Sequence, residues 1–296
     1  MRYPVLAVVN SSKYLFAFDL DGTLVHNLPS GERTVPPRLL DCVRRLGRHA
    51  HVMVATGRRY RTALPIISLL PAASYSVTNN GMVVKDASGK TIHRESLDRA
   101  DALSIAKLFH KTHLDVIFAT DGYHENIDFI FWKQALKEAD APRKLFERFH
   151  EVSAVVETME DVLSFRRDIP LLEVATLGPY HELLEARELI EPQLPKPYRA
   201  VVVKGIGEDS WGALEIFSGK VSKWTGILSV KKLLNVEMVV AVGDDENDIE
   251  MLQSADISVV MSHAQPHVKR VASRDVEGPE GLAQYLEEWI ERLEQE

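Results

Sequence analysis

The chain has 296 residues, of which 45% are hydrophobic and 26% are charged. This length exceeds what one hydrophobic core usually fills, and the composition is typical of globular proteins, so we expect two well-packed domains. The formal net charge of −8 argues against a general nucleic-acid-binding protein, which needs an excess of lysine and arginine on at least one surface.

The start of the chain and its single cysteine predict a soluble, cytoplasmic protein. An apolar run covers only residues 4–9 and ends at polar residues, so we expect no signal peptide. No segment approaches the ~18 consecutive apolar residues of a membrane-spanning helix, so we expect no membrane partner. Cys42 is the only cysteine, which excludes an internal disulfide and a cysteine zinc cluster and suits a reducing compartment.

Short apolar runs alternate with a helical pattern in the first third of the chain. Residues 15–18 form an apolar run that stops at Asp19, which predicts a buried strand. Apolar residues at helical spacing follow Pro36 and predict a helix that ends near Gly47. A second apolar run, residues 51–55, ends at a polar turn. Strand, helix and strand in this order predict a parallel crossover unit.

The middle of the chain differs in texture from both ends. Residues 84–217 mix strand-like runs with helical stretches, which indicates an α+β module. The simplest topology is a discontinuous parallel-sheet domain of residues 1–83 and 218–296, with the module inserted at an exposed loop, where insertions are well tolerated. An apolar stripe at helical spacing over residues 282–293 predicts a packed C-terminal helix. The strand-like runs of the module cover residues 116–119, 171–177, 200–203 and 213–217.

Polar residues that can handle phosphate and metal follow three of the predicted strands. This matters because ligands of open parallel sheets bind at the carboxyl ends of the strands. Asp19 and Asp21 lie two apart on an extended chain, so their carboxylates project to the same side. Gly22 then permits a sharp backbone turn. Aspartates are also common in turns after strands, so one of them alone would not indicate a site.

The run FDLDGTL, residues 18–24, resembles the nucleophile motif of the haloacid dehalogenase superfamily. The other motifs of that superfamily follow in order, and the long insertion lies between the second and the third, as in the Cof-type branch with a C2B cap. The resemblance covers nearly the whole chain, with the cap matched by position and texture. It implies an α/β fold: a Rossmann-like parallel-sheet core, residues 1–83 and 218–296, and an inserted α+β cap, residues 84–217, that sets substrate specificity.

By this resemblance, the first two motifs supply the nucleophile, the acid and the phosphate contacts. Asp19 would attack phosphorus, and Asp21 would protonate the leaving oxygen and later activate water. The second motif corresponds to Thr56-Gly57-Arg58, with the Thr56 hydroxyl bonded to the transferring phosphoryl group and Gly57 and Arg58 as candidate substrate contacts. Arg58 could reach the phosphate or brace the loop through an ion pair, and we favour the brace.

Two further candidates flank the inserted module. Asn80 precedes a glycine and could touch the substrate or form a plain turn. The run GKVSK, residues 219–223, resembles the motif whose lysine holds the phosphoryl oxygens, and its pattern places that role on Lys223. Lys220 lies one helical spacing away and could substitute. A proline that commonly precedes this motif is replaced here by residues 216–218.

The run GDDEND after the strand-like residues 236–242 resembles the acidic fourth motif. Magnesium prefers hard oxygen ligands and keeps several waters, so a few carboxylates suffice. The resemblance implies Mg²⁺ held by Asp19, by the carbonyl of Asp21 and by Asp244. Asn247 and Asp248 would support Asp244 or contact the phosphate, with direct ligation of the metal by Asp248 as the alternative.

A loop after the next predicted strand departs from the family pattern. Residues 261–264 read Met-Ser-His-Ala, where the branch usually has Met-Gly-Asn-Ala, and this leaves any family role of the loop open. His263 and His267 are spaced as helix-borne metal ligands can be, but Pro266 lies between them. We therefore expect no metal site there.

The resemblance implies a Mg²⁺-dependent phosphatase that hydrolyses a small phosphate monoester, such as a sugar phosphate, through an aspartyl-phosphate intermediate. A phosphomutase is the first alternative, because the same acid–base pair can return phosphate to a sugar hydroxyl. A non-catalytic protein that binds phosphorylated metabolites is the second, and the filled catalytic positions disfavour it. We expect a small phosphorylated metabolite as partner, no nucleic acid, and a monomer or homodimer.

Overall fold

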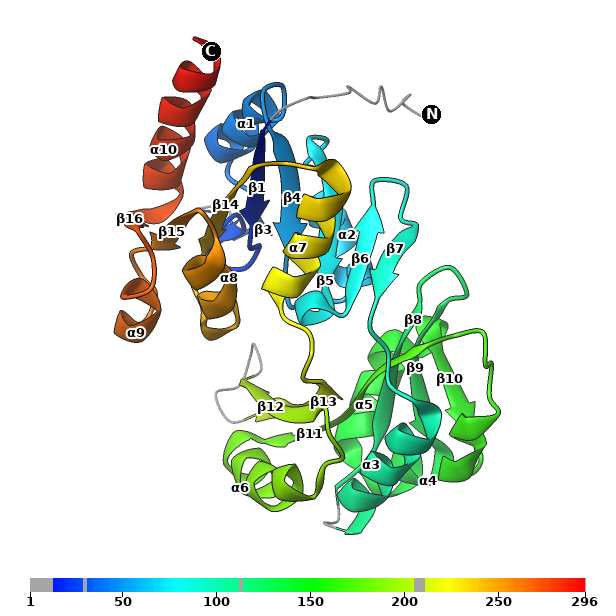
Figure 1. The fold of residues 1–296 in the computed structure, drawn as a ribbon. Coiled ribbons are helices and arrows are strands. Elements are labelled where there is room, and N and C mark those ends of the chain that lie inside the picture. The colour runs from blue at the N-terminus through cyan, green and yellow to red at the C-terminus, as the bar shows by residue number, and fades with distance from the viewer. Residues whose placement is uncertain (1–12, 29–30, 112–113, 205–210, 296) are drawn as a thin grey trace. The chain divides into compact units, whose positions relative to one another are not determined.

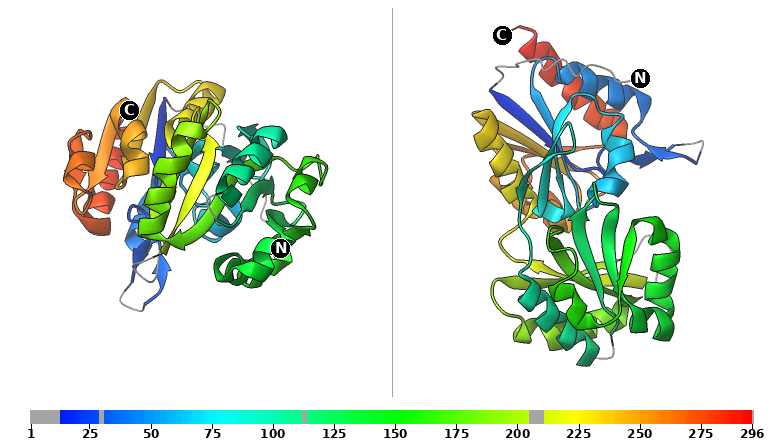
Figure 2. Two further views of the ribbon diagram at one scale, coloured as in Figure 1. Left: turned by 90° about the horizontal axis from the view of Figure 1, so that it is seen from below. Right: turned by 90° about the vertical axis from the view of Figure 1, so that its right-hand side faces the viewer.

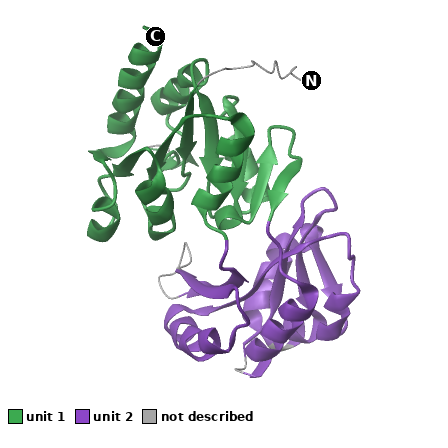
Figure 3. Cartoon of the chain, viewed as in Figure 1, with its two compact units in different colours: residues 1–94, 221–296 green, residues 95–220 purple. Residues whose placement is uncertain are grey.

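The computed structural model describes residues 13–28, 31–111, 114–204 and 211–295, and it divides into two compact units (Figure 1 and Figure 3). The first unit comprises the chain up to Arg94 and from Val221 onward, and the second comprises Glu95–Lys220. The sequence predicted crossings at 83/84 and 217/218, whereas residues 84–94 complete β6 and form β7 of the first unit. The apolar run at residues 4–9 lies outside the described residues.

The first unit is built on an eight-stranded sheet with the strand order β16-β15-β14-β1-β4-β5-β6-β7. Neighbouring strands from β16 to β5 run parallel, and β6 and β7 are antiparallel additions at one edge. A two-stranded hairpin of β2 and β3 follows β1. The strands are β1 Tyr14–Phe18, β2 His26–Asn27, β3 Arg33–Thr34, β4 His51–Ala55, β5 Ala73–Thr78, β6 Val83–Asp86, β7 Thr91–Arg94, β14 Met238–Gly243, β15 Ile257–Met261 and β16 Arg274–Val276.

Helices cover both faces of this sheet, because alternate residues of each buried strand point to opposite sides. Phe16 and Phe18 of β1 pack in one core with α1, α2 and α10, and Leu15 and Ala17 pack in the other with α7, α8 and α9. Helices α1 and α10 lie side by side (Figure 1 and Figure 2). The helices are α1 Pro37–Leu46, α2 Tyr60–Ile67, α7 Lys223–Leu234, α8 Ile249–Ser254, α9 Pro266–Lys269 and α10 Gly278–Leu293, with 3₁₀ turns η1 Asn79–Gly81 and η5 Glu246–Asp248.

The second unit is a six-stranded sheet with the order β10-β9-β8-β11-β13-β12, mainly antiparallel. Helices α3 and α6 pack on one face, and apolar residues of α4 and α5 pack against β8 and β9 on the other. The predicted strand-like runs all fall in this sheet. Its elements are α3 Arg99–Lys111, β8 Ile117–Gly122, β9 Ile127–Trp132, α4 Lys133–Glu138, α5 Asp140–Phe149, η2 His150–Val152, β10 Ser153–Val156, η3 Met159–Leu163, β11 Leu171–Pro179, α6 Tyr180–Ile190, η4 Glu191–Gln193, β12 Tyr198–Lys204 and β13 Trp211–Ser218.

Within the described ranges, no helix is both long enough and apolar enough to cross a lipid bilayer.

Candidate active site

The predicted site residues gather at the carboxyl ends of three neighbouring strands of the first unit. Because β14, β1 and β4 are adjacent and parallel, the residues that follow them lie at one edge of the sheet. Asp19 follows β1, and its backbone N–H donates to the Val242 carbonyl on β14 at 2.9 Å. Thr56 follows β4 and is buried. Parallel register therefore places side chains that are far apart in sequence side by side.

Lys223 is the buried centre of this group. Its ammonium donates to Asp19 Oδ1 at 2.6 Å and to Asp248 Oδ1 at 2.7 Å, and its side chain is only 1% exposed. The position is fixed because Ser222 caps the N-terminus of α7 and Lys223 is the first helical residue. Lys220, the alternative from the sequence, is exposed. The geometry thus brings Lys223 to the carboxylates.

A third carboxylate, that of Asp244, lies beside the two that bond Lys223. Asp19, Asp244 and Asp248 each offer an oxygen, and these atoms lie within 4.8 Å of one another. Burial raises the pKa of Asp19 well above its usual range, and the charges of Asp248 and Asp244 add to the rise while Lys223 opposes it. Burial also raises the pKa of Asp244. A divalent cation bound by these carboxylate oxygens would offset the excess of negative charge, so the residues fit Mg²⁺.

Asp244 is held by a donor at each of its oxygens. Thr23 Oγ1 donates to Oδ1 at 2.8 Å, and His263 Nε2 lies 3.0 Å from Oδ2. The backbone at Gly22 also lies close to the Asp244 carboxylate. Gly22 has φ +89°, and a Cβ built on it would lie 2.2 Å from Asp244 Oδ2. The predicted turn at Gly22 therefore serves a close approach between two loops.

Asp21 forms a separate cluster with two arginines. The Arg58 Nε donates to Asp21 Oδ2 at 2.6 Å, and Arg33 Nη2 donates to Oδ1 at 2.6 Å. Burial raises the pKa of Asp21, but the hydrogen bond and charge of Arg58 and the charge of Arg33 outweigh it, so the net shift is downward. Arg58 thus makes the ion pair that the sequence favoured.

The remaining candidates meet beside Thr56. The Asn247 side-chain amide donates to Asn80 Oδ1 at 2.9 Å, and the Asn80 N–H donates to the Thr56 carbonyl at 3.2 Å. Gly57 leaves room for both asparagines, because a Cβ there would lie 2.9 Å from Asn80 Oδ1. Asn80 has φ +52°, a conformation that asparagine tolerates better than most residues. These contacts make Asn80 and Asn247 neighbours of the Thr56-Gly57 turn.

Residues 16–279 match the family model described as haloacid dehalogenase-like hydrolase. This chain belongs to that family.

Named members of the family resemble this hydrolase along almost its whole length. The HMP-PP phosphatase of Serratia proteamaculans is 27% identical, covering 93% of this chain and 95% of the relative. A 5-amino-6-(5-phospho-D-ribitylamino)uracil phosphatase of Bacillus subtilis is 24% identical, covering 95% and 99%. The pyridoxal phosphate phosphatase of Escherichia coli is 24% identical, covering 88% and 91%. The predicted family, its Cof-type branch and the enzyme class of phosphoric monoester hydrolase are confirmed.

Solved structures confirm the predicted α/β fold class. A haloacid dehalogenase-like hydrolase from Bacteroides thetaiotaomicron matches with a TM-score of 0.71 at 21% identity, covering 93% of this chain and 98% of that chain. A sugar phosphatase of subclass IIB matches with a TM-score of 0.65 at 16% identity, covering 93% and 98%. Identities this low show a shared fold.

Three residues near the site of this haloacid dehalogenase-like hydrolase were not predicted from sequence: Thr23, Arg33 and His263. Thr23 belongs to the FDLDGTL run, and this motif is the sequence feature that points to it. Arg33 lies on the short strand β3 and has no distinguishing pattern. His263 lies in the loop whose departure from the family pattern made its role uncertain. It pairs with Asp244, while His267 pairs with Glu246 at 3.4 Å, so the two histidines contact different carboxylates.

Proposed function

We propose that this protein is a Mg²⁺-dependent phosphatase that hydrolyses a small phosphate monoester through an aspartyl-phosphate on Asp19. The observation that carries the proposal is a buried Asp19 paired with Lys223, beside two further carboxylates and the Thr56 strand end. The relatives named for HMP-PP, pyridoxal phosphate and a phosphoribitylaminouracil support a small phosphorylated metabolite as the substrate.

In the first proposed step, a carboxylate oxygen of Asp19 attacks phosphorus and the bond from phosphorus to the leaving oxygen breaks. Lys223 and Thr56 hold the phosphoryl oxygens, and Asp21 gives its proton to the leaving oxygen. In the second step, Asp21 takes a proton from the water that attacks phosphorus. The bond between phosphorus and Asp19 breaks, which releases inorganic phosphate and restores the carboxylate.

The proposed metal ligands are Asp19, the Asp21 carbonyl and Asp244. When bound there, Mg²⁺ supplies positive charge that stabilises the transferring phosphoryl oxygens. Thr23 and His263 keep the Asp244 carboxylate in one orientation through their contacts to its two oxygens.

Asp21 needs a proton to act as the acid, yet its contacts with Arg58 and Arg33 favour its anion. We infer that Asp21 leaves these arginines when substrate binds and then faces the leaving oxygen. The same ion pairs would return Asp21 to its anionic form after product release.

We also infer that the second unit, Glu95–Lys220, is a C2B-type cap that selects the leaving group. The support is its α+β architecture and its insertion between the second and third motifs. The carboxylates and Lys223 address only the phosphoryl group, so recognition of the rest of the substrate needs other residues.

The test is release of inorganic phosphate from a panel of phosphorylated sugars, pyridoxal phosphate and phosphorylated pyrimidines, with Mg²⁺ or with a chelator. We expect Mg²⁺-dependent release without a bisphosphate requirement, which distinguishes hydrolysis from mutase activity. Asp19→Asn should reduce turnover about a thousandfold or more, and hydroxylamine should trap an acyl phosphate only in the unmodified protein. Asp245→Asn is the matched control, because Asp245 is an exposed neighbour of the cluster. Asp19→Asn with turnover equal to the control would refute the proposal.

A further inference from the structure

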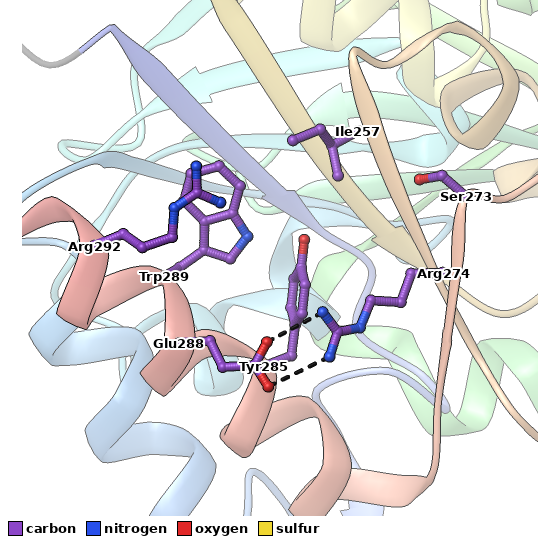
Figure 4. Close-up of a pocket in the computed structure, with 7 residues that line it drawn as sticks. All are labelled: Ile257, Ser273, Arg274, Tyr285, Glu288, Trp289 and Arg292. Atoms are coloured by element: carbon purple, nitrogen blue, oxygen red, sulfur yellow. Dashed lines mark hydrogen bonds and ion pairs between the residues drawn. The ribbon is translucent and has the colours of Figure 1, made fainter.

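A cavity lies in the first unit, at the end of the parallel strands opposite the carboxylates (Figure 4). Ile257 begins β15 and Arg274 begins β16, whereas Asp244 and His263 follow the carboxyl ends of β14 and β15. At about 3.3 Å per residue, the length of β15 alone separates the two ends by about 13 Å. The cavity has a volume of 280 Å³ and is lined by Ile257, Ser273, Arg274, Tyr285, Glu288, Trp289 and Arg292.

One face of α10 supplies most of the lining. Tyr285, Glu288, Trp289 and Arg292 follow the spacing that brings helical residues to one side, and Figure 4 shows them directed toward the start of β15 and β16. The two rings are buried, at 5% exposure each. Together with Ile257 on the strand side, they supply the apolar part of the lining.

Each guanidinium of the cavity lies over an aromatic ring. The Arg274 guanidinium is 4.7 Å from the centre of the Tyr285 ring, and that of Arg292 is 4.8 Å from the Trp289 ring. A guanidinium over a ring is held by cation–π attraction, and its N–H groups can still bond an anion. The rings thus hold both cations in place without occupying their donors.

The charges of the lining do not cancel. Glu288 pairs with Arg274, with Nη1 and Oε2 3.1 Å apart. Arg292 is exposed and forms no ion pair within 4.0 Å among the residues that the structure describes, so its N–H groups have no carboxylate partner there. The Tyr285 hydroxyl points into the cavity (Figure 4).

We propose that this cavity binds a small organic anion that carries one carboxylate or phosphate group on a flat ring. The anionic group bonds Arg292 and the Tyr285 hydroxyl, and the ring lies against Ile257, beside the two buried aromatic side chains. The volume lies near the lower limit of small-molecule sites, about 300 Å³, which suits a metabolite with a single ring. This site is independent of the proposed phosphatase reaction.

The test is nuclear magnetic resonance of the indole N–H groups in the full chain, which has four tryptophans. Trp289→Phe assigns the Trp289 signal. Benzoate and phenylphosphonate are the carboxylate and phosphate probes, and benzyl alcohol is the neutral ring of similar size. We expect a saturable shift of the Trp289 signal with at least one anion and a much weaker response to the alcohol. The tighter anion identifies the natural anionic group.

Arg292→Gln should weaken binding of that anion about tenfold or more, because it removes a charged donor. Arg148→Gln is the matched control, since Arg148 also lies over an aromatic ring, Phe149 at 5.2 Å, but in the second unit. A saturable shift that the control variant retains and Arg292→Gln loses supports the site. No saturable shift with either anion, equal affinity for benzyl alcohol, or unchanged affinity in Arg292→Gln overturns it.

Discussion

Lys223→Met replaces the buried ammonium by an uncharged side chain of similar length. Lys223 is 1% exposed and bonds Asp19 at 2.6 Å and Asp248 at 2.7 Å, both of them buried. Removing one partner of a buried ion pair costs about 3–5 kcal/mol, because the remaining charge is left without compensation. We therefore expect the free energy of unfolding to fall by about that amount at pH 8 in the absence of divalent cations.

The loss should depend on pH in a definite direction. Burial already raises the pKa of Asp19 in the folded protein, and loss of Lys223 raises it further. The folded variant then binds a proton that the unfolded chain has released. The stability that this proton contributes is full at and below the unfolded pKa of about 4 and is lost as the pH rises through the folded pKa. The deficit relative to the unmodified protein should be smaller at pH 5 than at pH 8.

Urea unfolding at both pH values, in the presence of a chelator, measures this deficit. Lys232→Met is the matched control, because Lys232 is an exposed lysine of the same helix α7. Adding Asp248→Asn to Lys223→Met should recover part of the stability, since one of the two uncompensated carboxylates is removed. Equal midpoints for Lys223→Met and the control at pH 8 would refute the buried ion pair. An identical deficit at both pH values would assign the loss to packing instead of charge.

Three further changes test other parts of the site and the core. His263→Ala removes a contact to Asp244 Oδ2 and should weaken Mg²⁺ binding about tenfold by calorimetry; an unchanged dissociation constant would contradict this role. Gly22→Ala places a Cβ 2.2 Å from Asp244 Oδ2 at φ +89°, and should lower both the melting temperature and phosphate release. Burial and the neighbouring Glu287 raise the pKa of Cys42 to about 11, so its thiol should react slowly with a disulfide reagent at pH 8 until the protein is unfolded.

The arrangement of the site followed from the sequence wherever a polar residue ended an apolar strand. Asp19, Thr56 and Asp244 each follow such a run, and parallel pairing of β14, β1 and β4 brings them to one edge. Arg33 could not be predicted this way, because it lies on a two-residue strand and reaches Asp21 only through the β2–β3 hairpin. A strand that short has no periodicity to read.

The predicted boundary at residue 83 lies before the end of this part of the first unit, at Arg94, because β6 and β7 also lack a clear sequence pattern. The strand β6 pairs antiparallel with β5, and β7 with β6, at the edge of the otherwise parallel sheet. Residues 91–94 of β7 are mostly exposed, so the sequence there carries no continuous apolar run. The change in sequence pattern that predicted the inserted module therefore begins within β6 and β7, before this part of the first unit ends at Arg94.

The sequence left two roles open for Asp248, support of Asp244 and direct ligation of the metal. They differ in how many oxygen lone pairs of Asp248 must be free. Its Oδ2 accepts the backbone N–H groups of Asp244 at 3.0 Å and Asp245 at 3.1 Å, and its Oδ1 accepts the Lys223 ammonium. Two donors fill the lone pairs of Oδ2, which leaves at most one on Oδ1. We infer that Asp248 positions Lys223 and the Asp244 loop, while Asp19 and Asp244 are the carboxylate ligands of the metal. Asp248→Asn can still accept at its carbonyl but loses the charge beside Lys223, so it should weaken Mg²⁺ binding less than Asp244→Asn does.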